Sequence, residues 1–226
     1  MVLLNSFNDL WMAESLNKFV PDFITQKRYD KVKSILIYAI LAQVLSGWIL
    51  FLLFFLWADF LSIHYFADPR SLDIIKLFAF FFLGTTFFHV ISTFFQAVQN
   101  TFLLKLAELF RMWFIVWFTL FMFLSGNGNI FTYSLSWVLG LYFWIIIILG
   151  LFYQKYYKPY LKDVKAIYSK ELFFSIFKYA LVVFLGSQAA HLLSQVDMQM
   201  IIYMLGNKDA GYYTNYLSLI GIPFMI

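Results

Sequence analysis

Five apolar runs, each long enough to cross a lipid bilayer, follow one another along this chain. A spanning helix needs about 20 predominantly apolar residues. The runs cover 34–58, 74–97, 107–125, 134–153 and 172–205, and a sixth begins near Gly211. Hydrophobic residues make up 63% of the chain and charged residues only 12%, whereas soluble domains carry roughly 25% charge. We therefore expect an all-α polytopic membrane protein, because a helix satisfies its own backbone hydrogen bonds in lipid.

The basic residues lie on alternate connections between these runs. Of the 16 Lys and Arg residues, 13 are assigned to three connections: the one before residue 34, the one with Lys105 and Arg111, and the lysine-rich one at 154–171 together with the following Lys178. The positive-inside bias places these three on the cytoplasmic side. The net charge of +4 is explained by this pattern, so no nucleic-acid partner is expected. The lysine-rich connection is expected to face anionic membrane lipids.

Polar residues persist at membrane depth on two of the runs. At about 100° per residue, one face of the second run holds a polar stripe within about 120°. Its members are Thr85, His89, Ser92, Thr93, Gln96, Gln99 and Asn100. A second stripe on the fifth run falls within about 140°, with Ser187, Gln188, His191, Ser194, Gln195 and Gln199. Asp197 lies about 60° beyond the edge of that stripe.

Two interpretations of the stripes stay open. Polar groups in membrane helices either join helices by hydrogen bonds or mark a pathway for substrate. Two long stripes on separate helices favour a hydrated cavity, and Asp197 is the best single functional candidate. The runs 107–125 and 134–153 carry bulky apolar residues nearly all round, and we expect both to face lipid.

Motifs for other chemistry are missing from the sequence. It contains no GxxxxGK[ST] loop, no HExxH and no hydrolase elbow, and the chain has no cysteine. We therefore expect neither a nucleotide-driven pump nor an enzyme.

Three segments carry a family resemblance. The segment 194–216 resembles a hallmark of polysaccharide flippases, with Asp197, an apolar stretch, Leu205-Gly206, a polar turn and Gly211-Tyr212. The segment 12–33 is similar to the connection between their second and third helices. The segment 95–100 lies where the family often has a Gln-Gly-type turn, although the glycine is missing here. The chain thus resembles the Wzx-type exporters of O-antigen, polysaccharide and teichoic acid, in the superfamily that includes MATE multidrug transporters.

The resemblance implies a MATE-like fold of two six-helix lobes around a cavity that opens alternately to each side. Residues 1–153 would be most of the first lobe, 154–171 the cytoplasmic connection, and 172–226 the start of the second lobe. On this view the chain is a fragment, from part of helix two to part of helix eight.

The implied substrate is a polyprenyl-pyrophosphate-linked oligosaccharide, moved across the cytoplasmic membrane of a prokaryote by a functional monomer. No cofactor is implied. The implied energy source is a gradient of Na⁺ or H⁺, and a cation could bind near Asp197, which occupies a position comparable to a coupling carboxylate. Related flippases also place cationic side chains in the cavity for the pyrophosphate, and no Lys or Arg of this sequence is expected at mid-membrane.

Two alternatives remain. One is a MATE-like, cation-coupled exporter of small organic molecules, which predicts mid-membrane carboxylates in the first lobe; the runs before residue 153 show none. The other is a polytopic enzyme or assembly factor that acts on lipid-linked sugars.

Overall fold

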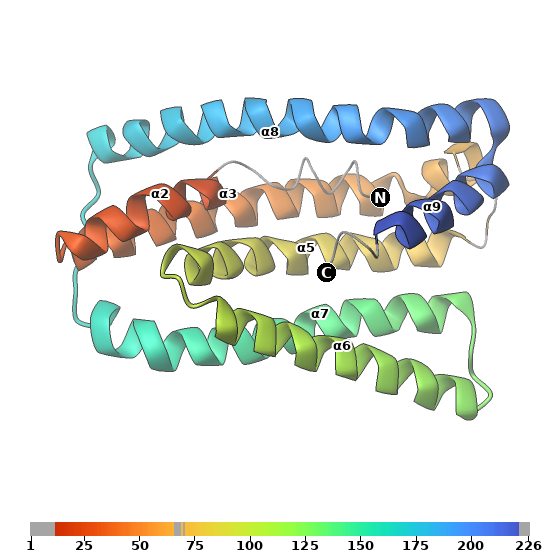
Figure 1. The fold of residues 1–226 in the computed structure, drawn as a ribbon, viewed down its shortest axis with the longest axis horizontal. Coiled ribbons are helices and arrows are strands. Elements are labelled where there is room, and N and C mark those ends of the chain that lie inside the picture. The colour runs from red at the N-terminus through yellow and green to blue at the C-terminus, as the bar shows by residue number, and fades with distance from the viewer. Residues whose placement is uncertain (1–11, 66–68, 70, 222–226) are drawn as a thin grey trace. The chain divides into compact units, whose positions relative to one another are not determined.

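The computed structural model describes residues 12–65, 69 and 71–221, and all regular structure in this part of the chain is helical (Figure 1). In chain order the elements are α2 (Met12–Thr25), α3 (Tyr29–Leu56), α4 (Ala58–Phe60), η1 (Leu61–Tyr65), α5 (Ser71–Ala97), α6 (Thr101–Leu124), α7 (Ile130–Phe152), η2 (Tyr153–Leu161), α8 (Lys170–Leu205) and α9 (Asn207–Gly221).

The predicted apolar runs correspond to these helices. Within the described residues, four helices are long and apolar enough to cross a membrane: Tyr29–Leu56, Ser71–Ala97, Thr101–Leu124 and Ile130–Leu161. They match the first four predicted runs to within a few residues at most ends. The 36-residue helix α8 covers the fifth run, and α9 contains the predicted start of the sixth. The prediction of an all-α polytopic membrane protein is therefore confirmed.

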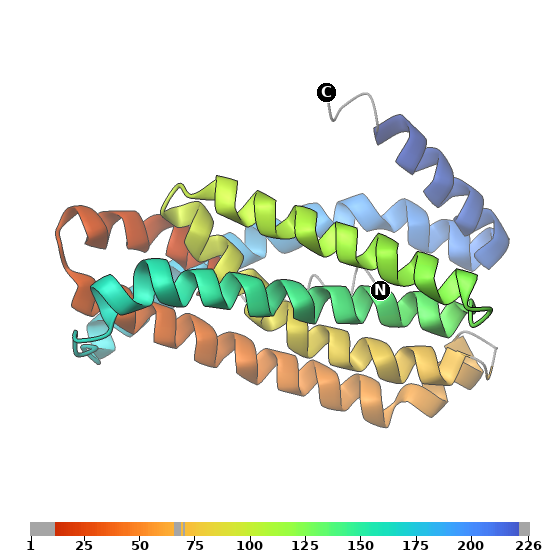
Figure 2. The ribbon, with the colours of Figure 1, turned by 90° about the horizontal axis from the view of Figure 1, so that it is seen from below.

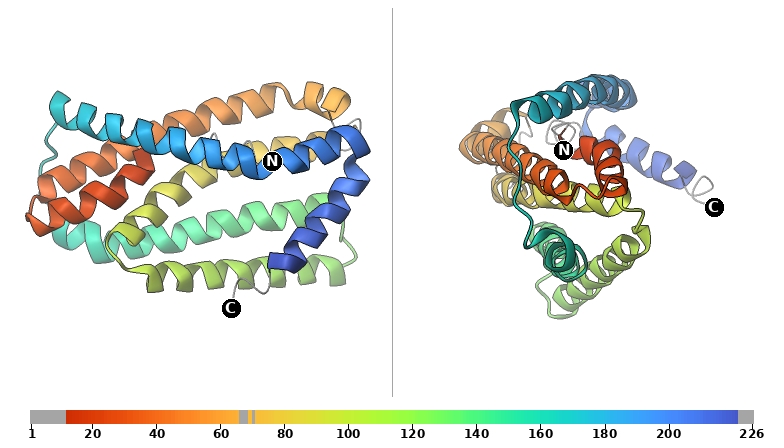
Figure 3. Two further views of the ribbon diagram at one scale, coloured as in Figure 1. Left: turned by 45° about the horizontal axis from the view of Figure 1, so that its top comes forward. Right: turned by 90° about the vertical axis from the view of Figure 1, so that its left-hand side faces the viewer.

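The chain divides into two compact units at a point inside α8, between Val183 and Phe184. We call the unit that ends at Val183 the first unit and the unit that contains the rest of α8 and α9 the second unit. In the first unit, α5 is the central helix. It packs against α2, α3 and α7, and α6 packs mainly on α7 (Figure 2; Figure 3, right). The core between these helices is strongly aromatic, with Trp144, Phe94 and Phe95 fully buried.

Close approach of α5 to its neighbours depends on two glycines. A Cβ on Gly47 of α3 would clash with the Thr86 side chain of α5. A Cβ on Gly84 of α5 would lie 2.7 Å from Leu141 Cδ2 of α7. Small residues let membrane helices pack closely where hydrophobic burial gives little drive. Gly47 and Gly84 thus fix α5 between α3 and α7.

The expectation that both later runs face lipid holds for one helix and is wrong for the other. Four residues of α6 are buried, and its large apolar residues are mostly exposed, as predicted. Helix α7 instead packs between α5 and α6, and Trp144 and Ile148 on it are fully buried. Lipid and a neighbouring helix are equally apolar surroundings, so an apolar run all round a helix does not distinguish them.

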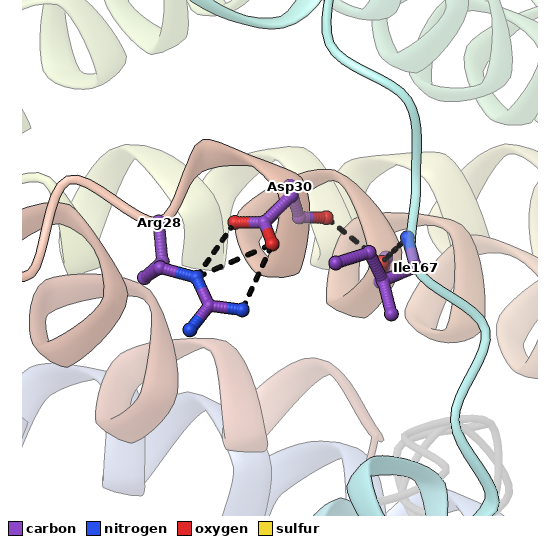
Figure 4. A network of polar contacts seen from close by, with 4 residues as sticks. Arg28, Asp30 and Ile167 are labelled. Atoms are coloured by element: carbon purple, nitrogen blue, oxygen red, sulfur yellow. Dashed lines mark hydrogen bonds and ion pairs between the residues drawn. The ribbon is translucent and has the colours of Figure 1, made fainter.

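The lysine-rich connection is fastened to the start of α3. The Lys33 ammonium donates hydrogen bonds to the carbonyl oxygens of Leu161 at 2.9 Å and Val164 at 2.8 Å, and to that of Lys162 at 3.4 Å. Next to it, the Ile167 amide donates to Ser34 Oγ at 2.9 Å, and Ser34 donates to the Asp30 carbonyl (Figure 4). Lys33 therefore supplies hydrogen-bond donors to backbone carbonyls at and just after the end of η2, which have no partner within that helix.

A further contact brings the α5–α6 turn to the same end of the first unit. Asn100 Nδ2 donates to Tyr156 Oη of η2 at 2.6 Å. The three connections predicted to be cytoplasmic thus share one end of this unit (Figure 1). Which membrane face that end meets stays a prediction.

Candidate functional site

Two of the three buried hydroxyls of the α5 stripe bond within their own helix. Thr85, Ser92 and Thr93 are all at most 6% exposed. Thr85 donates to the Phe82 carbonyl at 2.9 Å, and Ser92 donates to the His89 carbonyl at 3.0 Å. Such back-bonding lets a hydroxyl lie at membrane depth without an unmet donor.

The other members of this stripe differ in exposure. His89 is half-buried, with its ring 5.5 Å from that of Phe88. Gln96, the next-to-last residue of α5, is exposed. Asn100 is half-buried and bonds to Tyr156, as described above. The stripe therefore runs from the packed middle of α5 to the lysine-rich end of the first unit.

Asp197 lies on the part of α8 that belongs to the second unit, and α9 supplies its partner. The Asp197 carboxylate is exposed and accepts a hydrogen bond from Tyr213 Oη at 3.0 Å. One residue further along each helix, Thr214 Oγ1 donates to Met198 Sδ at 3.8 Å. The backbone between them turns at Gly206, which has φ +94°. Sequence reasoning missed Tyr213, although it belongs to the segment that carried the resemblance.

For the remaining predicted residues of the fifth run, the structure describes the backbone alone. Gln188, His191, Gln195 and Gln199 belong to α8 by their backbone, and their side chains lie outside the described residues. The proposal that the two stripes line one cavity therefore stays a prediction.

A second polar group in the first unit escaped the sequence analysis. Gln43, near the middle of α3, is 1% exposed, and Ser46 Oγ donates to its carbonyl at 2.9 Å and to its Oε1 at 3.2 Å. Its Nε2 has no hydrogen-bond partner among the described residues. The signal was a Gln three residues before a Ser-Gly pair, inside an otherwise apolar run.

The placement of Arg111 corrects the sequence analysis. It was counted with a connection, whereas it belongs to α6; the expectation that no cation lies at mid-membrane stays a prediction. In the structure it is the eleventh residue of α6, about 15 Å along that helix, and only 9% exposed. Its guanidinium lies 3.5 Å from the Glu108 carboxylate, and its Cγ lies near Gly140 of α7. A buried cation is expected to be paired in this way.

No group of three or more His, Asp or Glu residues that could hold a metal ion occurs in the described part of the chain.

The Arg28 guanidinium, which lies outside the membrane spans, pairs with the Asp30 carboxylate at 3.0 Å. This hydrogen bond raises the pKa of the guanidinium.

Comparison with known proteins agrees with the helical membrane architecture. Residues 7–226 match the family model described as polysaccharide biosynthesis protein. The chain is 23% identical over 223 residues to the uncharacterized membrane protein MJ1068 of Methanocaldococcus jannaschii. That match covers 94% of this chain and 44% of the relative, so the chain spans less than half the length of the curated relative. No solved structure matches the chain.

The family match covers nearly the whole chain and includes each of the three segments that carried the resemblance. The chain therefore belongs to the polysaccharide biosynthesis protein family, with Wzx-like flippases, and is a multi-pass membrane protein.

Proposed function

We propose that this protein takes part in flipping a polyprenyl-pyrophosphate-linked oligosaccharide across the cytoplasmic membrane by alternating access. The observation that carries the proposal is the family match over residues 7–226 of a chain built of membrane-spanning helices. A sugar attached to a lipid cannot cross the hydrocarbon layer unaided, because its hydroxyls would lose their hydrogen bonds to water. A transporter of this class must offer polar groups at membrane depth.

We assign polar groups of this kind to both compact units. In the first, these are His89 and Gln96 of the α5 stripe, because the buried hydroxyls of Thr85 and Ser92 already bond within their own helix. In the second, Asp197 is exposed and held by Tyr213. We propose that an ion, Na⁺ or H⁺, binds at the Asp197 carboxylate and stabilises one state of the transport cycle, since a ligand shifts an equilibrium only by its differential affinity for the two states.

Arg111 takes a different part in this proposal. It is buried against α7 and paired with Glu108, so we assign it to helix packing and not to the pyrophosphate. Removal of the part-buried Glu108 carboxylate would be costly, because it leaves the buried guanidinium without its partner.

Depletion of the complete gene product in its native host tests the proposal. We expect finished lipid-linked oligosaccharide to accumulate on the cytoplasmic face, where an externally added glycosidase does not reach it. Asp197→Asn should reproduce the accumulation while the protein still reaches the membrane. Asp209→Asn, which changes an exposed carboxylate of α9, is the matched control and should complement fully.

Other outcomes separate the alternatives. Incomplete oligosaccharide in the depleted cells would indicate an enzyme or assembly factor. Normal surface polysaccharide with greater sensitivity to cationic drugs would indicate a multidrug exporter. Either result would contradict the flippase proposal.

A further inference from the structure

A pocket of about 420 Å³ opens at the lysine-rich end of the first unit. Three elements wall it: the α2–α3 turn, the end of α5 with its following turn, and η2. Its volume falls within the range of about 300–1,000 Å³ that is typical of ligand pockets. Because its walls come from three separate segments, an occupant would join them.

The lining of the pocket suits a hydrocarbon chain better than a sugar. Ile24, Phe94 and Val98 contribute apolar surface from α2, α5 and the following turn. The rings of Tyr29 and Tyr160 stack with their centroids 5.5 Å apart. Tyrosines of this kind, with an apolar body and a polar tip, are enriched where a membrane protein meets the headgroup layer.

Four lysines adjoin the lining residues in sequence. Lys27 stands between the lining residues Thr25 and Tyr29, and Lys155 directly precedes the lining residue Tyr156. Lys158 stands between Tyr156 and Tyr160, and Lys162 directly follows Leu161. All four lysines are exposed, and none forms an ion pair within the described part of the chain.

Neighbouring cations at this end are already engaged. Arg28 pairs with Asp30 (Figure 4), and Lys33 donates to three carbonyls. The Lys31 ammonium lies 5.4 Å from the centre of the Phe23 ring. Lys27, Lys155, Lys158 and Lys162 thus remain available to an anionic headgroup, and Lys27 and Lys155 adjoin lining residues of two different walls of the pocket.

We propose that this pocket binds one anionic phospholipid of the surrounding leaflet, with an acyl chain inside the pocket and the phosphate between Lys27 and Lys155. A bilayer supplies such a lipid at the depth where these helices end. Each lysine near an anionic membrane surface favours binding. The bound lipid would join the α2–α3 turn to η2. The inference does not depend on the transport proposal.

Native mass spectrometry of the detergent-purified protein tests this site. Phosphatidylglycerol and phosphatidylcholine with the same acyl chains are the probes, titrated separately. We expect tighter retention of one phosphatidylglycerol molecule. The double variant Lys27→Gln/Lys155→Gln should weaken its binding about tenfold. Thr25→Trp, a larger side chain at an exposed lining position, should weaken it as well by filling the pocket.

The matched control is Lys165→Gln/Lys170→Gln, which removes two exposed lysines that lie in sequence away from the lining residues. It should change binding less than twofold. An equal loss of phosphatidylglycerol binding in the control would show that general surface charge causes the effect, and it would contradict a site at Lys27 and Lys155. Equal binding of both lipids, or unchanged binding in Thr25→Trp, would also overturn the proposal. The lysine variants decide the matter if Thr25→Trp does not fold, because both lysines are exposed.

Discussion

The hydroxyls on α5 show how single polar residues are accommodated in this apolar chain. Thr85, Thr86 and Ser92 each donate to the carbonyl three residues earlier. A helical wheel predicts that Thr85 and Ser92 share a face, but it does not show whether a hydroxyl bonds to its own helix or to another group. The depth and face of the stripe were therefore predictable, whereas the partners were not.

Asp197 illustrates the same limit in the second unit. Its position in an apolar run made it the best candidate from sequence. Its partner Tyr213 lies 16 residues away on another helix. Only the turn at Gly206, whose left-handed backbone ends α8, brings the two together. The angle of that turn is not encoded in any local pattern of polarity.

The left-handed backbone at Gln99 lowers the stability of the protein, because a residue with a Cβ occupies this turn. Gln99, in the turn where the family often has a glycine, has φ +56°, and this left-handed conformation is unfavourable for residues with a Cβ. We expect Gln99→Gly to raise the free energy of unfolding by up to about 1 kcal/mol. Thermal unfolding in detergent would show it as a higher midpoint.

Gln96→Gly is the matched control for that substitution. Gln96 is an exposed residue in the last turn of α5 with ordinary helical backbone, so glycine there should lower stability, by at most about 1 kcal/mol. Destabilisation by both substitutions would contradict the strain at Gln99.

Lys33 carries a second prediction at this scale. Lys33→Met keeps an unbranched side chain that is one atom shorter, and it removes three hydrogen bonds to the carbonyls of Leu161, Lys162 and Val164. We expect faster amide hydrogen exchange at residues 162–169, because local opening there costs less free energy. Lys165→Met, an exposed lysine in the same connection, should leave the exchange unchanged. Equal exchange in both variants would show that Lys33 does not hold the connection.

At the scale of whole helices, length and existence were predictable and the packing partners were not. Apolar runs of the right length identified α3, α5, α6 and α7, because hydrocarbon thickness sets the length of a spanning helix. Helix α7 was wrongly assigned to lipid. The informative signal was small residues: Ser136 bonds to Thr119 of α6 at 3.0 Å, and a Cβ on Gly140 would clash with Ile115.

The contact between α3 and α5 yields a prediction at the same scale. Gly47→Ala places a methyl group against Thr86, and we expect it to lower the free energy of unfolding by about 1–3 kcal/mol. Gly150→Ala is the control, because nothing lies within 4 Å of the added Cβ. It should be neutral or stabilising by up to about 1 kcal/mol. Similar thermal midpoints for the two variants would contradict close packing at Gly47.

At the scale of the molecule, the basic connections determine the expected orientation. The structure gathers three of them at one end of the first unit, as the alternation of charge required. A hydrogen-bond network does not reveal which membrane face that end meets. The bias of basic residues toward the cytoplasm supplies that prediction.

Cysteine labelling tests this orientation without background, because the chain has no cysteine of its own. Single cysteines at Ser71 and Asn127 should react with a membrane-impermeant thiol reagent in intact cells, and one at Ser169 should react only after permeabilisation. Reaction of the Ser169 variant in intact cells would reverse the topology.

Flipping itself is the most direct measurement of the central claim. The complete gene product would be reconstituted into proteoliposomes with a fluorescent polyprenyl-pyrophosphate-linked oligosaccharide, and the fraction open to an added glycosidase would be followed over time. Without flipping, the glycosidase reaches only the oligosaccharide of the outer leaflet, about half of the total. We predict that the protein raises this fraction toward the whole pool, and that Asp197→Asn slows the rise at least tenfold. A fraction that stays at one leaflet with the folded, unsubstituted protein, under both Na⁺ and H⁺ gradients, would contradict the account.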